Sequence, residues 1–134
     1  MRRVASPSPA SARRRTRYDM GQAPEDPVAG ISEHGEAVIV RLAGELDLYT
    51  APAVRSALLE SVERQPARLV VDLADVTFID STTLGALVEA RSRLASREAF
   101  ILAAPGLETR RALEVSGLHR HFEVRETLED ALQI

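Results

Sequence analysis

The chain of 134 residues contains no cysteine, no lysine and no tryptophan, and only 4% of its residues are aromatic. Without cysteine, neither disulfide bonds nor thiolate metal centres can form. Without lysine, the Gly-x-x-x-x-Gly-Lys loop that cradles nucleotide phosphates is excluded. The three histidines (His34, His119 and His121) offer little material for a metal site, so we expect neither a metal nor another cofactor.

Long apolar runs are also lacking. No stretch approaches the roughly 20 residues that a membrane-spanning helix needs, and the N-terminus lacks the apolar central region of a secretory signal. We therefore expect no membrane contact and a cytoplasmic location. The hydrophobic content of 45% and the charged content of 28% are those of an ordinary globular domain.

Charge divides the chain into two parts. Residues 1–26 carry six Arg against three acidic residues and have no periodic apolar pattern, which predicts a disordered Arg/Ser/Pro-rich tail. Residues 13–17 could bind a polyanion or an acidic lipid surface, although a solvated tail is the favoured interpretation. Residues 27–134 carry eleven Arg against seventeen acidic residues, a balance that argues against direct binding of nucleic acid.

Residues 27–134 show the apolar periodicities of one α/β domain. Strands are predicted at 28–32, 37–43, 69–73, 99–103 and 122–125, and helices from 50, at 82–95, at 107–116 and from 127. Thr50 is expected to cap the first helix. A tight turn joins the first two strands, whereas helices separate the later ones. This order predicts a mixed central sheet, with a parallel core and an N-terminal antiparallel hairpin strand, packed with about four helices.

Two acid-bearing loops follow neighbouring strands. Residues 44–47 read Gly-Glu-Leu-Asp, and residues 80–83 read Asp-Ser-Thr-Thr. The carboxyl ends of parallel strands gather at one edge of a sheet. We therefore expect Asp47 and Asp80 to lie around Ser81.

The Asp-Ser-Thr-Thr run permits two interpretations. Taken alone, it is favoured as a helix cap, which contributes about 1 kcal/mol. Alternatively, Ser81 accepts a phosphate of roughly −1.5 to −2 charges, which the start of a helix tolerates. Such a phosphate would repel an acidic partner or block a fitted one, and would leave the core unchanged.

Catalysis is not expected. A serine nucleophile needs a positioned base, yet Ser81 is not in a Gly-x-Ser-x-Gly elbow and no histidine is tied to it by spacing. His119 and His121 are expected on the surface. Asp47 and Asp80 could form a carboxylate pair, but nothing in the sequence suggests a deep pocket, and we predict that the protein is not an enzyme.

Four motifs, in order and at fitting intervals, resemble the STAS domains of bacterial anti-sigma factor antagonists. They are the Gly-Glu-Leu-Asp loop at 44–47, Ala51-Pro52, the segment 70–82 that ends in Phe-Ile-Asp-Ser-Thr, and Ser-Gly-Leu at 116–118 with Phe122. The resemblance covers residues 28–132. It implies a single STAS-type domain over residues 27–134.

The resemblance also implies a partner-switching cycle. The unphosphorylated domain binds an anti-sigma factor with a histidine-kinase-like ATPase fold and so frees a sigma factor. That kinase phosphorylates Ser81 (Thr82 is the weaker candidate), which ends binding, and a serine phosphatase restores it. The implied partner-binding residues are Asp47, Asp80, Ser81, Thr82 and Thr83. Thr83 replaces the glycine of the family's Asp-Ser-Ser/Thr-Gly-Leu-Gly motif, and its β-branched side chain is expected to narrow the approach of a kinase loop.

Two alternatives remain open from the sequence. One is a STAS scaffold or ligand-binding subunit of a transport or stress-signalling complex that does not switch. The other is a small hydrolase that uses Ser81, which would require a histidine or carboxylate within hydrogen-bond reach of its hydroxyl.

Overall fold

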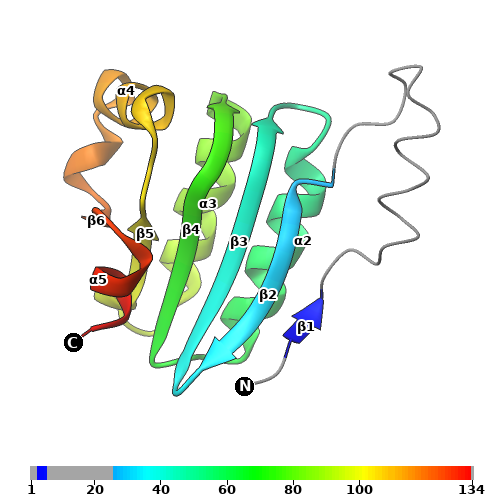
Figure 1. The fold of residues 1–134 in the computed structure, drawn as a ribbon, viewed down its shortest axis with the longest axis vertical. Coiled ribbons are helices and arrows are strands. Elements are labelled where there is room, and N and C mark those ends of the chain that lie inside the picture. The colour runs from blue at the N-terminus through cyan, green and yellow to red at the C-terminus, as the bar shows by residue number, and fades with distance from the viewer. Residues whose placement is uncertain (1–2, 6–25, 134) are drawn as a thin grey trace.

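The structure, a computed structural model, describes residues 3–5 and 26–133 and is built on a six-stranded mixed sheet (Figure 1). The strands follow one another in chain order across the sheet: β1 (Arg3–Ala5), β2 (Val28–His34), β3 (Ala37–Leu46), β4 (Arg68–Ile79), β5 (Phe100–Ala103) and β6 (Glu123–Arg125). β2 pairs antiparallel with both β1 and β3, whereas the pairs from β3 to β6 are parallel. The predicted mixed sheet is confirmed.

Helices cover both faces of the sheet unequally. The described helices are α2 (Ala51–Glu63), α3 (Ser81–Arg93), α4 (Leu107–Ser116) and α5 (Leu128–Leu132), with short 3-10 turns at Arg97–Ala99 and Leu118–Arg120. Figure 1 shows α2 and α3 side by side behind β3 and β4, and the short α5 on the opposite face. None of these described helices is long and apolar enough to span a membrane.

The main core lies between the sheet and α2, α3 and α4. Along β3, Val38, Val40 and Leu42 point to this side at the two-residue period of a strand, and they join Leu87 of α3 and Leu113 of α4 in one buried cluster. β4 is the central strand, and its first half is buried on both faces, as expected for a parallel strand between two others. This packing fixes the register of β3 against β4.

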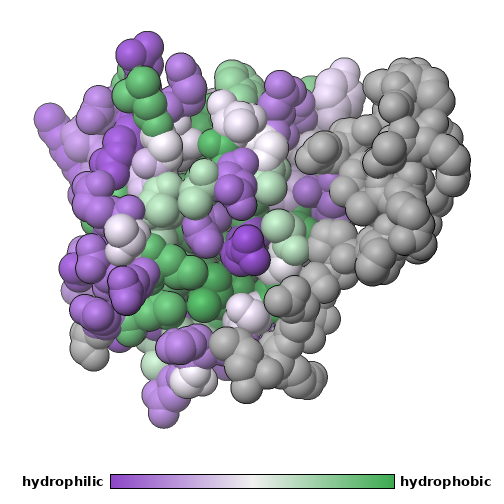
Figure 2. Space-filling model, in the orientation of Figure 1, coloured by the Kyte–Doolittle hydropathy of each residue, from purple (hydrophilic) through white to green (hydrophobic). Residues whose placement is uncertain are grey.

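The second face of the sheet carries a smaller apolar cluster. Ile39, Val70 and Ile101 are buried there under Ala131 of α5. Figure 2 looks onto this face, where apolar side chains gather over the strands and hydrophilic ones border them. Two residues beyond Ile39 in β3, Arg41 on this face forms ion pairs with Asp72 (3.8 Å) and Asp75 (3.9 Å).

Some boundaries differ from those predicted. β4 continues to Ile79 instead of stopping at residue 73, because it stays paired with β3 up to Leu46. Within the tail that was predicted to be disordered, Arg3–Ala5 forms β1 and pairs with β2. Residues 1–2 and 6–25 lie outside the described residues, so for them the expected disorder stays a prediction.

Candidate functional site

The two acid-bearing loops meet at the carboxyl edge of the sheet. The last pair of the β3–β4 ladder joins Leu46 to Ile79, and beyond it the backbone N–H of Asp80 donates to the carbonyl oxygen of Leu46 at 3.0 Å. The chain then leaves β3 through Asp47 and leaves β4 through Asp80, which precedes Ser81 at the start of α3. The structure therefore brings together the loops that carry the predicted site residues.

Asp47 organises the loop between β3 and α2. Its carboxylate accepts the backbone N–H groups of Tyr49 (3.0 Å) and Thr50 (3.1 Å). Its own backbone N–H donates to the hydroxyl of Thr50 at 2.8 Å. Thr50 does precede α2, but its side chain makes no capping hydrogen bond to the helix, so its predicted role as a hydroxyl cap is wrong because Asp47 engages that hydroxyl instead.

Asp80 caps α3 and leaves Ser81 in the open. The carboxylate of Asp80 accepts the backbone N–H of Thr83 at 3.1 Å, the usual bond of an N-cap residue. Ser81 is the first helical residue, and both Ser81 and Thr82 are exposed. A group added to either hydroxyl would project from the surface at the positive end of the helix dipole.

Thr83 was predicted to contact a partner, and its burial contradicts this. Its exposed fraction is 0%, and it lies on the core face of α3 together with Leu84 and Leu87. Among the described residues its hydroxyl oxygen has no hydrogen-bond partner. Because Thr83 points into the domain, it cannot form part of a docking surface.

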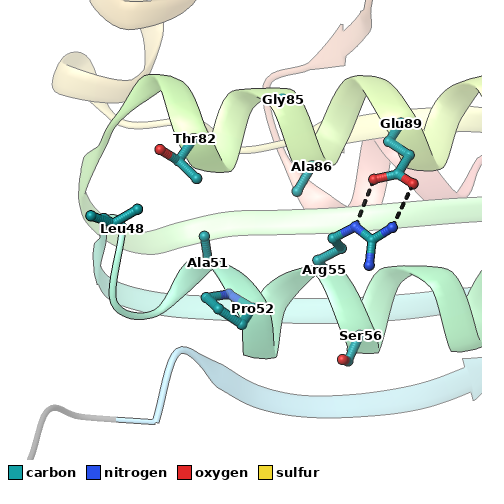
Figure 3. Close-up of a pocket in the computed structure, with 9 residues that line it drawn as sticks. All are labelled: Leu48, Ala51, Pro52, Arg55, Ser56, Thr82, Gly85, Ala86 and Glu89. Carbon is teal, nitrogen blue, oxygen red and sulfur yellow. Dashed lines mark hydrogen bonds and ion pairs between the residues drawn. The ribbon is translucent and has the colours of Figure 1, made fainter.

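A shallow groove of about 420 Å³ runs between α2 and α3, directly beside this corner (Figure 3). Its walls near the corner are the small residues Ala51 and Pro52 of α2 and Gly85 and Ala86 of α3. Thr82 lies at the end of the groove nearest Ser81. Small side chains on both helices explain why the space between them stays open.

An ion pair closes the far end of the groove. Both guanidinium nitrogens of Arg55 that face Glu89 donate to its carboxylate, Nε at 2.7 Å and Nη2 at 2.8 Å. Arg93, one turn further along α3, donates to the same carboxylate at 2.8 Å. The hydrogen bond from Arg55, supported by both positive charges, lowers the pKa of Glu89 from its usual value, although partial desolvation opposes the shift.

Exposed apolar side chains surround the site. Leu48 is 61% exposed and Tyr49 is 83% exposed, both in the loop after Asp47, and Phe78 near the end of β4 is 48% exposed. Leu48 reaches the mouth of the groove, where Figure 3 shows it facing Thr82. These residues were not predicted as site residues from the sequence. An adjacent Leu and Tyr that fit neither a helix nor a strand period could have indicated an exposed apolar contact surface.

Ser81 has no hydrogen-bonded base among the described residues. Among the hydrogen bonds of the described residues, none links its hydroxyl to a histidine or a carboxylate. His119 and His121 are exposed, as predicted, and lie in the segment between α4 and β6. In residues 3–5 and 26–133, no cluster of acidic and histidine residues could hold a metal ion. The requirement set for the hydrolase alternative is thus unmet in this part of the chain.

Fold and site together define a small α/β domain whose polar loops gather at one edge of a mixed sheet. The STAS domain family model matches residues 29–131, so the chain belongs to the STAS family. It is 34% identical over 110 residues to the anti-sigma-F factor antagonist RsfB of Mycobacterium tuberculosis, and the alignment covers 82% of this chain and 90% of that protein. It is 30% identical over 105 residues to the anti-sigma-B factor antagonist of Bacillus subtilis, with 77% and 94% covered.

Solved structures agree with the family. The crystal structure of an anti-sigma factor antagonist from Mycobacterium paratuberculosis superimposes with a TM-score of 0.72 at 35% identity. The match covers 76% of this chain and 87% of that one. The predicted resemblance to STAS-domain anti-sigma factor antagonists is therefore confirmed.

The orphaned hydroxyl of Thr83 gives a stability prediction. Thr83→Val keeps the shape of the side chain and removes a buried hydroxyl that has no partner among the described residues, so we expect the free energy of unfolding to rise by up to about 1 kcal/mol. Urea unfolding followed by circular dichroism measures this. Thr82→Val, at the exposed neighbour, is the control and should bring no gain. If Thr83→Val lowers the free energy of unfolding by more than about 1 kcal/mol, the conclusion that the Thr83 hydroxyl makes no stabilising hydrogen bond is contradicted.

The lowered pKa of Glu89 gives a prediction about pH. A carboxyl whose pKa is lower in the folded state stabilises the fold above its ordinary pKa, here 4.5, and loses that contribution as the pH falls through the folded value. We therefore expect Glu89→Gln to be less stable than wild type at pH 7, with the difference disappearing in strong acid. Urea unfolding at a series of pH values measures it.

The matched control is Glu126→Gln, because among the described residues Glu126 pairs with Arg110 alone and its side chain is 74% exposed. This variant should lose less stability at pH 7 than Glu89→Gln does. If Glu89→Gln and Glu126→Gln behave alike, the double pairing of Glu89 does not stabilise the domain.

Proposed function

We propose that this protein is an anti-sigma factor antagonist switched by phosphorylation at Ser81. Unphosphorylated, it binds an anti-sigma factor with a histidine-kinase-like ATPase fold and thereby releases a sigma factor in the cytoplasm. That kinase phosphorylates Ser81 and ends the complex, and a serine phosphatase reverses the modification. The antagonist itself needs no cofactor and does not contact nucleic acid directly.

One observation carries the proposal: the hydroxyl of Ser81 is exposed at the first position of α3, beside a second exposed loop from β3. A kinase can reach such a hydroxyl without unfolding its substrate. The names of the M. tuberculosis and B. subtilis relatives support the same partner class, since both are antagonists of anti-sigma factors.

A phosphate at this position is compatible with the fold. It would add roughly −1.5 to −2 charges next to the unpaired N–H groups of a helix start, which favour anions. The capping hydrogen bond from the Thr83 N–H to the Asp80 carboxylate involves neither the Ser81 nor the Thr82 side chain. Modification therefore leaves the helix start and the buried core in place.

The same phosphate is expected to end binding. It adds bulk and a strongly hydrated charge at the centre of the surface that a partner must cover, and burying an unpaired charge is costly. The residues at the ends of β3 and β4 are already acidic: Glu45 is exposed, and Asp47 and Asp80 are half-buried. None of the three forms an ion pair with another described residue. A partner fitted to the free hydroxyl loses that fit.

Thr83 does not argue against phosphorylation. The sequence led us to expect that its β-branched side chain narrows the approach of a kinase loop. Because that side chain is fully buried, the surface around Ser81 is formed by other residues, and the kinase would meet Thr82 rather than Thr83.

The test is phosphorylation followed by binding. Purified anti-sigma factor kinases from the same genome are incubated with Mg-ATP and this protein, and mass spectrometry locates the phosphate. We expect one phosphate on Ser81, absent from Ser81→Ala and retained in Thr82→Ala. Absence of phosphate with every kinase would contradict the proposal.

Binding then separates a switch from a constant scaffold. We expect Ser81→Ala to bind its anti-sigma factor about as well as wild type, and Ser81→Asp to bind at least about tenfold more weakly, as for a charge placed in the centre of an interface. Titration calorimetry in the presence of a non-hydrolysable ATP analogue measures the affinities of both variants. Equal affinities would favour the STAS scaffold that does not switch.

A further inference from the structure

We infer that the groove between α2 and α3 is a docking site for an apolar side chain that the anti-sigma factor presents next to a basic residue. The inference rests on the proposed function and deepens it, because it names what the partner must carry. Three independent features of the described residues lead to it: the shape of the groove, its position and the charge around it.

The shape suits an inserted side chain. The groove of about 420 Å³ has small residues on both walls, and Leu48, 61% exposed, stands at its mouth. Apolar grooves between two helices are a recurrent way of holding a partner's apolar side chain, since its burial contributes binding energy without a new polar contact. An exposed leucine at the mouth adds apolar surface that the same contact would cover.

The position links the groove to the switch. Thr82 lines the groove and follows Ser81 directly in α3. Leu48 follows Asp47 directly in the neighbouring loop, so both sides of the groove mouth belong to the loops that meet at Ser81 (Figure 3). A partner that covers the Ser81 hydroxyl thus also covers the entrance of the groove.

The charge around the mouth selects a basic partner. Asp47, which precedes Leu48, and Asp80, two residues before Thr82, have no ionic partner among the described residues, whereas Arg55 at the far end is held by Glu89. An acidic rim around an apolar slot is complementary to a segment that carries an apolar side chain next to Arg or Lys. The ion pair of Arg55 and Glu89, which are 34 residues apart in the sequence, links α2 to α3 and so limits the length of the groove.

Gly85 allows the groove to be filled without disturbing the fold. It lies in α3, and a Cβ added there would meet nothing within 4 Å outside its own helix. Replacing a glycine inside a helix by Ala or Leu also favours the helical conformation. Gly85→Leu should therefore occupy the slot while its melting temperature stays at or above that of wild type.

The experiment measures the affinity of purified anti-sigma factor kinases from the same genome for four proteins. We expect Gly85→Leu to bind at least about tenfold more weakly than wild type and Gly85→Ala about threefold more weakly. Ala53→Leu is the matched control, since Ala53 is exposed on α2 but does not line the groove, and it should bind as wild type. Gly85→Ala preserves the test if the leucine variant fails to fold.

The outcomes separate the two proposals. If Gly85→Leu binds like wild type while Ser81→Asp binds weakly, the groove inference is overturned and the proposed function stands. If no anti-sigma factor binds the wild-type protein, both are overturned. If the partner is basic, the affinity of the wild-type protein should fall as the salt concentration rises from about 50 to about 500 mM, because salt screens exposed charges. An affinity independent of salt would overturn the inference that the partner carries a basic residue.

Discussion

The site depends on one backbone hydrogen bond, from the N–H of Asp80 to the carbonyl oxygen of Leu46. It extends the parallel pairing of β3 and β4 by one residue beyond Ile79, so that the loops that follow the two strands begin side by side at one edge of the sheet. Because the side chains of a strand alternate between faces, a slip of one residue would exchange buried and exposed positions along β4. The packed core therefore fixes where Ser81 lies.

Within the turn that follows, neighbouring residues have separate tasks. The carboxylate of Asp80 caps α3, Thr83 and Leu84 are buried, and Ser81 and Thr82 face outward. The stabilising contacts thus involve residues on either side of the exposed pair but not their hydroxyls. Chemistry on Ser81 can change the surface at small cost to the fold, which is what a reversible switch requires.

Much of this followed from sequence because it depends on local patterns. The strand and helix periods, the common edge of the two loops and the cap before α3 were all predicted. The burial of Thr83 was missed, although its spacing of four residues from Leu87 places it on the core face of α3. The hydroxyl of Thr50 was assigned to the helix, but Asp47 competes for it within the loop. The groove could not be predicted, since its width depends on how α2 packs against α3.

The most direct test of the central claim is the amide NMR spectrum of the protein before and after stoichiometric phosphorylation of Ser81. The account predicts that shifts are confined to residues 44–50 and 78–86 and the groove, with the amides of residues 37–43 in β3, of β5 and of the buried Leu87 and Ala90 in α3 unchanged. Changes spread through the sheet, or broadening of the core resonances, would show that phosphorylation alters the fold itself, and would contradict a switch that acts at the surface alone.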